Sequence, residues 1–169
     1  MSSLLALSLS IAVLGGIWAF LALGPLAGYV LVWAGFIAWG CYFHSGGDSN
    51  ALTKTICGNI YGIVIAWIAL LIIFKFGAGD AGVIAIAVVV AVTVFFLVIV
   101  ASVDVLSVVP ANVYGYAATV AYTLHAGAQD NLLGGGFANP ALLLIVSMVL
   151  GAIFGWISGA VAKAITKSD

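Results

Sequence analysis

The sequence predicts an all-α integral membrane protein with six transmembrane helices, arranged as two inverted three-helix repeats. Three observations support this prediction: the composition, a series of six apolar runs, and a segment that occurs twice. Hydrophobic residues make up 66% of the 169 residues and charged residues only 5%. A soluble chain of this length needs a polar surface, which this composition cannot supply. We therefore expect lipid to surround a single membrane domain that comprises residues 1–169.

The first half contains three apolar runs. A helix needs about 20 apolar residues to cross the hydrocarbon layer of a bilayer. Leu4–Leu23 meets this length, and Leu26–Phe43 forms the second run. The third, Ile56–Phe74, follows a polar stretch at Ser45–Thr55 that we expect to be a loop. This loop is a candidate re-entrant segment.

The second half contains three further runs, of which the middle one is short. Ala81–Val103 is the most aliphatic and predicts a plain lipid-facing span. Pro110 interrupts the fifth run, and the 14 residues of Ala111–Leu124 would rise only about 21 Å as a helix. Either Val105–Val109 completes this span or the helix is short. Short or broken segments at matching places in two halves are typical of transporter binding sites.

The sixth run, Pro140–Ile165, carries three glycines at four-residue spacing. These are Gly151, Gly155 and Gly159, which share one face of a helix. Small residues on one face allow the backbone of another helix to approach closely. We expect this face to be a helix-packing surface and one possible contact in a homo-oligomer.

The repeated segment ends each time in a histidine. Phe36–Asn50 contains His44, and Ala117–Asn131 contains His125, 81 residues later. In both, a glycine follows two residues after the histidine, and an Asp and an Asn come soon after. We assign residues 1–79 to the first repeat and 80–169 to the second. A unit of three spans cannot return to its starting side, so the second unit must be inverted.

The lysines predict the orientation. With six spans, Lys54, Lys163 and Lys167 lie on the side of both termini, whereas Lys75 lies on the other side. Positive charge favours the cytoplasmic side of a membrane. Both termini are therefore expected in the cytoplasm.

Inverted repeats would bring the two polar segments, after the second and fifth helices, to the bilayer midplane from opposite sides. Imidazole both donates and accepts hydrogen bonds, which suits a passage for a small polar molecule. Three alternatives remain: the histidines are interfacial anchors, the aspartates are solvated loop acids, and the asparagines cap helices. The candidate pore and solute-binding residues are His44, His125, Asn59, Asn139, Asp48 and Asp130.

Aromatic residues flank both histidines. Trp39, Tyr42 and Phe43 precede His44, and Tyr122 precedes the second histidine. Most aromatic side chains of a membrane protein anchor it at the interfaces or pack between helices. These four are also candidates for an aromatic constriction that selects small uncharged solutes.

Several functional classes are not expected. The chain lacks Arg and Glu, so it has no basic surface for nucleic acid. It also lacks the common hydrolase and nucleotide-binding motifs, so we predict no enzyme activity. A metal site built from Cys41, His44, Asp48 and Cys57 is disfavoured because the second repeat does not preserve these residue types. Haem bound by the two histidines is a weak alternative, and we predict no cofactor.

Two resemblances add to these predictions. Asn139-Pro140-Ala141 resembles the half-helix motif of aquaporins, which suggests an Asn at a helix start and not membership of that family. Trp39–Gly47 and the six-run layout resemble a bacterial inner-membrane family of unknown function typified by YcdZ. The second resemblance covers nearly the whole chain and implies a location in the bacterial inner membrane.

The scarcity of charge favours a passive mechanism. Pumps and coupled transporters usually carry intramembrane charges. We therefore predict a channel or facilitator for a small uncharged polar solute, of the class of urea, short amides, ammonia or water. The alternatives are a non-transporting accessory subunit of a membrane complex and a small transporter coupled to protons through Asp104.

Overall fold

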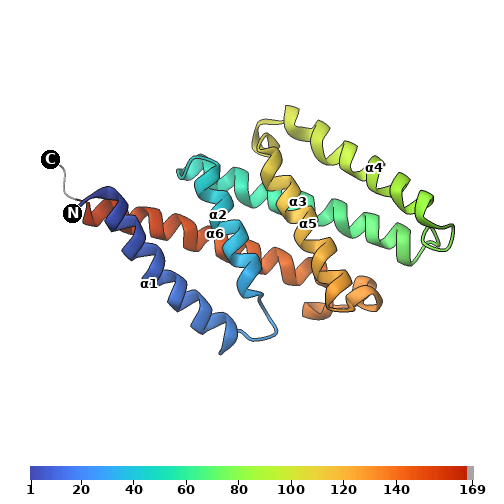
Figure 1. Ribbon diagram of the computed structural model, residues 1–169, viewed down its shortest axis with the longest axis horizontal. Coiled ribbons are helices and arrows are strands. Elements are labelled where there is room, and N and C mark those ends of the chain that lie inside the picture. The colour runs from blue at the N-terminus through green and yellow to red at the C-terminus, as the bar shows by residue number, and fades with distance from the viewer. Residues whose placement is uncertain (167–169) are drawn as a thin grey trace.

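A computed structural model describes residues 1–166, which form a bundle of helices (Figure 1). The α-helices are α1 (Ser3–Leu23), α2 (Val32–His44), α3 (Ser49–Phe74), α4 (Val83–Ile99), α5 (Val109–His125) and α6 (Pro140–Ile165). Short 3₁₀ helices lie between α4 and α5, at η1 (Val100–Ser102) and η2 (Asp104–Leu106), and between α5 and α6, at η3 (Ala128–Leu133) and η4 (Gly136–Ala138). Over these residues the protein is therefore all-helical, as predicted.

Four helices are long and apolar enough to cross a membrane: α1, α3, α4 with its 3₁₀ extension to Ser102, and α6. The other two are shorter, with 13 residues in α2 and 17 in α5. At 1.5 Å per residue they rise about 20 Å and about 26 Å, less than the ~30 Å of a hydrocarbon layer. Among the residues described, the six expected spans are thus four long helices and two short ones, and the fifth is short because α5 begins only at Val109.

The second predicted span begins later than expected, because residues 24–31 are mostly irregular. Pro25 lacks a backbone N–H and Gly28 has a left-handed φ of 84°, and both interrupt a helix. Side chains supply the missing backbone partners. Trp18 Nε1 donates to the Val32 carbonyl at 2.9 Å, and Ser147 Oγ accepts from the Leu31 N–H at 2.9 Å.

The predicted loop at Ser45–Thr55 is mostly helix. Asp48 caps α3, because its Oδ1 accepts from the Ala51 N–H at 2.7 Å. Only the four residues from Ser45 to Asp48 form the turn, which is too short to re-enter the bundle. The segment between α5 and α6 is longer and folds back along α3, where the Leu132 carbonyl accepts from Trp67 Nε1 at 2.7 Å.

The two halves of the chain are interlocked. α1 and α2 pack mainly on α6, whereas α4 and α5 pack on α3, and α3 and α6 contact each other between these groups. Glycines permit the two closest crossings. A Cβ on Gly62 of α3 would overlap the Asn112 carbonyl of α5, and a Cβ on Gly151 of α6 would overlap the Gly35 carbonyl of α2.

The helices run between two ends of the bundle. The first end holds the start of α1, the α2–α3 turn and the end of α6, since Ser3, Gly46 and Thr166 line one hollow there. The second end holds the end of α3 and the α5–α6 segment. Lys54 and Lys163 lie at the first end and Lys75 at the second, whereas Lys167 is outside the described residues.

Candidate functional site

The two histidines lie at opposite ends of the bundle. His44 ends α2 at the first end, and His125 ends α5 at the second. Both side chains belong to exposed residues. The structure therefore does not bring the imidazoles together at the middle of the bundle, because α2 and α5 run in opposite directions.

The two predicted asparagines occupy unlike positions. Asn139 is the N-cap of α6: its Oδ1 accepts from the Ala141 N–H at 2.9 Å, and its Nδ2 donates to the Leu132 and Gly134 carbonyls. Asn59 lies inside α3 instead and is only 1% exposed. The two asparagines therefore differ in role despite their matching sequence positions: Asn139 is a helix cap, and Asn59 is a buried amide.

The two predicted aspartates lie at opposite ends of the bundle. Asp48 caps α3 and is exposed, and Asp130 is an exposed residue that forms an ion pair with Lys75 at 3.5 Å. Surface ion pairs of this kind contribute little to stability. Neither carboxylate reaches the interior of the bundle.

The predicted aromatic constriction is divided between the two ends. Trp39 Nε1 donates to Ser158 Oγ at 3.0 Å, and Tyr42 Oη donates to the Gly47 carbonyl at 2.6 Å. These side chains and Phe43 are near the first end. Tyr122 lies near the second end, where it lines a hollow with Trp33 and His125. The four rings therefore do not surround one opening.

The glycine face of α6 packs within the chain. A Cβ on Gly155 would lie 3.0 Å from Trp39 Cδ1, and a Cβ on Gly159 would lie 3.4 Å from Tyr42 Oη. Gly151 meets the backbone of α2 still more closely. All three glycines are buried, so this face is a contact between α6 and α2.

A line of buried polar side chains follows α3 and α5. On α5, Asn112, Thr119 and Thr123 are spaced by seven and four residues, which places them on one helical face. On α3, Thr55 and Asn59 are one turn apart. All five are 0–1% exposed, in a chain whose other buried residues are mostly hydrophobic. We call these five residues the α3–α5 polar line.

Four atoms of this line have no hydrogen-bond partner among the described residues. They are both amide atoms of Asn59, Oδ1 of Asn112 and Oγ1 of Thr123. An unpaired buried polar group destabilises a protein by about 1–3 kcal/mol, whereas a paired one is nearly neutral. The unpaired atoms are therefore an energetic exception, of the kind that an ordered water or a bound solute relieves.

The equivalent buried hydroxyls of α6 are fully paired. Ser147 Oγ accepts from Leu31 N and donates to the Leu143 carbonyl. Ser158 Oγ accepts from Trp39 and donates to the Gly155 carbonyl. Both serines are 0% exposed, like the residues of the polar line. The α2–α6 contact is thus structurally satisfied, and the unpaired atoms are confined to the α3–α5 pair.

The orientation of the Asn112 amide is fixed by its neighbours. Its Nδ2 donates to the Leu97 and Leu106 carbonyls, at 3.2 and 3.1 Å. These bonds close the irregular segment between α4 and α5. Its Oδ1 lies toward α3, 2.8 Å from the position of a Cβ on Gly58.

An ion pair between Lys54 and Asp104, which we call the charged clasp, lies at the first end of the polar line. Lys54 Nζ on α3 donates to Asp104 Oδ1 at 2.8 Å and to Ser107 Oγ at 3.1 Å. It thereby ties the segment before α5 to α3. The Asp104 side chain is 86% exposed, so water screens this pair.

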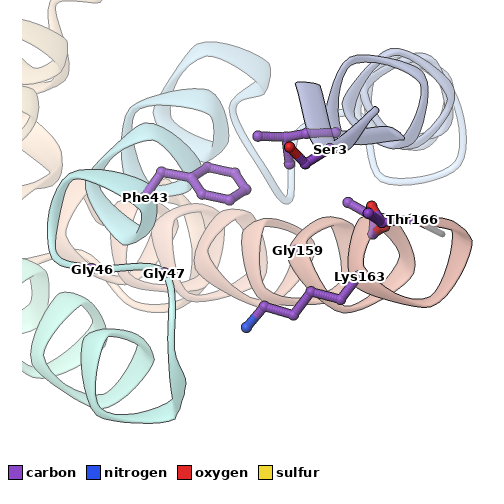
Figure 2. A pocket seen from close by; sticks show the side chains of 9 residues that line it. Ser3, Phe43, Gly46, Gly47, Gly159, Lys163 and Thr166 are labelled. Carbon is purple, nitrogen blue, oxygen red and sulfur yellow. The ribbon is translucent and has the colours of Figure 1, made fainter. Parts of the chain in front are cut away.

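A surface hollow of about 450 Å³ lies between α1, α2 and α6 at the first end (Figure 2). Phe43 extends toward α1, and Lys163 extends from α6 toward the side of the Gly46–Gly47 turn. A second hollow, of about 460 Å³, is the one lined by Trp33 and His125. Neither hollow is lined by Asn59 or Asn112, so the polar line is separate from both.

Comparison with known proteins assigns the family. Residues 8–163 match a sequence family described as "Protein of unknown function (DUF1097)". The chain belongs to this family. No curated protein and no solved structure matches it.

Of the residues with unpaired atoms, the sequence alone made Asn59 a candidate site residue, but not Asn112 or Thr123. Neither of these residues recurs in the first half of the chain, so the repeat does not mark them. A usable signal was present, because an amide inside an apolar run of a membrane protein is a candidate functional residue. Within residues 1–166 no group of three or more His, Cys, Asp or Glu is placed to hold a metal ion.

Proposed function

We propose that this member of the family is a multi-pass membrane protein through which a small uncharged polar solute passes along the α3–α5 polar line. The observation that carries the proposal is the Asn59 amide, buried inside α3 with neither of its polar atoms paired by the described chain. Asn59 is the eleventh of 26 residues in α3, about 15 Å from the start of the helix. That is near the middle of a membrane-spanning helix.

The energetics support a ligand for this amide. In hydrocarbon surroundings no bulk water is available to pair a polar group. A solute that hydrogen-bonds to Asn59 would remove the penalty of its unpaired atoms. The chain holds no buried charged side chain among residues 1–166, which favours a neutral solute over an ion.

The polar line runs between the two histidines. Thr123 is two residues before His125 at the second end, and Thr55 Oγ1 donates to Ser45 Oγ, next to His44, at 3.3 Å. On this proposal the imidazoles, which end α2 and α5, lie just beyond the two ends of the polar line. There each can exchange hydrogen bonds with an entering or leaving solute.

Inverted repeats are supported by the packing. α2 runs toward the first end and contacts α6, whereas α5 runs toward the second end and contacts α3, in matching Gly-mediated crossings. We propose that both termini are cytoplasmic and that the protein resides in the bacterial inner membrane, in agreement with the lysines at the first end. Labelling from outside intact cells tests this orientation: a Cys at position 125 should react and one at position 44 should not, after replacement of Cys41 and Cys57.

Swelling of proteoliposomes tests the function. Vesicles that carry the protein are exposed to urea, acetamide, glycerol and ions, and light scattering follows volume. We expect the Asn59→Leu variant to lower protein-dependent solute flux at least tenfold. The control is Ser147→Ala, because Ser147 is equally buried but its hydroxyl is paired. Equal flux in Asn59→Leu and the native protein would refute the proposal.

A non-transporting accessory subunit is the second candidate function. The exposed face of α4 favours it, because only Thr93 and Leu97 of that helix are buried. A partner protein or a second copy of the chain would cover this face. An accessory role predicts that detergent extracts contain a stoichiometric partner or a homo-oligomer, and that substitutions at Asn59 leave flux at the background of empty vesicles.

A further inference from the structure

We infer that the solute is a neutral N–H donor of the amide class, such as urea, formamide or acetamide. This inference rests on the proposed function, because it names the solute of the same site. It is derived from the hydrogen-bonding groups that the α3–α5 polar line leaves free.

The first group is a fixed acceptor, Asn112 Oδ1. The Nδ2 group of an asparagine carries two hydrogens, and here both face carbonyl oxygens, those of Leu97 and Leu106. Rotation of the amide by 180° would place its oxygen against these two carbonyl oxygens. Two hydrogen bonds would then be replaced by repulsion between oxygen atoms. Asn112 therefore presents only an oxygen toward α3, and that oxygen requires a donor.

The second group is the free amide of Asn59, which offers one acceptor and two donors. The backbones of α3 and α5 touch at this level, since a Cβ on Gly115 would lie 3.0 Å from Asn59 Cα and a Cβ on Gly62 would lie 2.9 Å from Asn112 C, so both asparagines belong to the same helix contact. A primary amide has the complementary set, with N–H groups for the two oxygens and a carbonyl for Asn59 Nδ2. A solute without N–H or O–H groups leaves both acceptors unpaired.

Charge and size narrow the class of solutes that the polar line can bind. A cation or anion in this region would have no counter-charge among the buried residues described, and an unpaired buried charge is strongly destabilising. Space beside the fixed acceptor depends on Gly58, because a methyl group there would lie 2.8 Å from Asn112 Oδ1. A side chain at position 58 would therefore crowd this buried acceptor, and only glycine leaves room beside it.

The test compares solutes of similar size that differ in hydrogen bonding. Acetamide offers N–H donors, dimethyl sulfoxide offers only an acceptor, and glycerol offers O–H groups. Proteoliposome flux of each is corrected for empty vesicles. We expect protein-dependent flux of urea and acetamide to exceed that of dimethyl sulfoxide at least tenfold, with glycerol between them.

Gly58→Ala should abolish this preference for amides, and Gly16→Ala is its control because a Cβ there meets nothing within 4 Å. If Gly58→Ala does not fold, as judged by size-exclusion chromatography, the near-isosteric Thr123→Val, which removes another unpaired polar group of the line, supplies the same comparison of solutes.

The two proposals fail differently. Protein-dependent flux of glycerol and dimethyl sulfoxide at the rate of acetamide would overturn the amide inference and leave the passage of neutral solutes intact. Flux of no solute above empty vesicles would overturn the proposed function, and the inference with it.

Discussion

Replacement of Asn59 by Leu should make the protein more stable while it lowers solute flux at least tenfold. Leu has nearly the shape of Asn, with a branched γ carbon, but it has no polar atoms. Asn59 has two unpaired buried atoms, so the substitution removes their desolvation penalty. Most substitutions of buried residues destabilise a protein, which makes a gain in stability a sharp expectation.

The expected magnitude follows from the measured range of such penalties. An unpaired buried group destabilises soluble proteins by about 1–3 kcal/mol. Polar interactions inside membrane proteins average about 0.6 kcal/mol, because the unfolded state in lipid or detergent also finds partners. We expect Asn59→Leu to raise the free energy of unfolding by about 1–2 kcal/mol. Unfolding by titration with a denaturing detergent, followed by circular dichroism, measures this change.

Ser147→Ala should have the opposite effect on stability, although Ser147 is as deeply buried as Asn59. Its hydroxyl accepts from Leu31 N, and its loss would leave that N–H unpaired at the irregular start of α2. We expect a decrease of about 1–2 kcal/mol in the free energy of unfolding, with flux retained. A destabilised Asn59→Leu protein would show that the Asn59 amide is paired in the native state, and the argument for the polar line would then be refuted.

Three further predictions concern the fold. Gly115→Ala should lower the free energy of unfolding by at least about 2 kcal/mol, since its methyl group would overlap the facing carbonyl of α3. Its control, Gly40→Ala on an open helix face, should raise the free energy of unfolding by up to about 1 kcal/mol in the same denaturation assay. A double-mutant cycle on Lys54 and Asp104 should give a coupling of about 0.3–0.5 kcal/mol that falls with salt; a salt-independent value would contradict the exposed geometry. Fragments 1–78 and 79–169, expressed together, should co-purify through a tag on one of them, because each contributes helices that pack on the other. Recovery of the tagged fragment alone would refute the interlocked packing.

Hydrophobicity alone located the long helices, although α3 begins at Ser49, seven residues before the predicted Ile56, because Asp48 caps it there. α1 and α6 lie within a residue of their predicted bounds, because lipid solvation requires a continuous apolar helix of sufficient length. The short helices were harder. α2 begins six residues later than the apolar run, since tertiary hydrogen bonds from Trp18 and Ser147 stabilise an irregular backbone that no local pattern reveals.

The candidate site was only partly predictable for a related reason. The recurrence of His44 and His125 marks the ends of corresponding helices, and the structure shows that both are exposed there. Residue recurrence therefore located a shared helix boundary. The unpaired state of Asn59 and Asn112 depends on which helices pack together, and the pairing of α3 with α5 across the two halves is not encoded in either segment alone.

On the proposed pathway, the movement that admits a solute should occur at α5. Trp39, Ser158 and Ser147 tie α2 to α6 through paired buried groups, so separation of that pair would break several hydrogen bonds. The α3–α5 contact has unpaired polar atoms instead, and its clasp at Asp104 is exposed to water. Displacement of α5 from α3 therefore breaks fewer buried hydrogen bonds than displacement of α2 from α6, and a bound amide would replace what is lost. On the proposed pathway, the asymmetry in hydrogen bonding between two similar crossings thus predicts a static role for one and a moving role for the other.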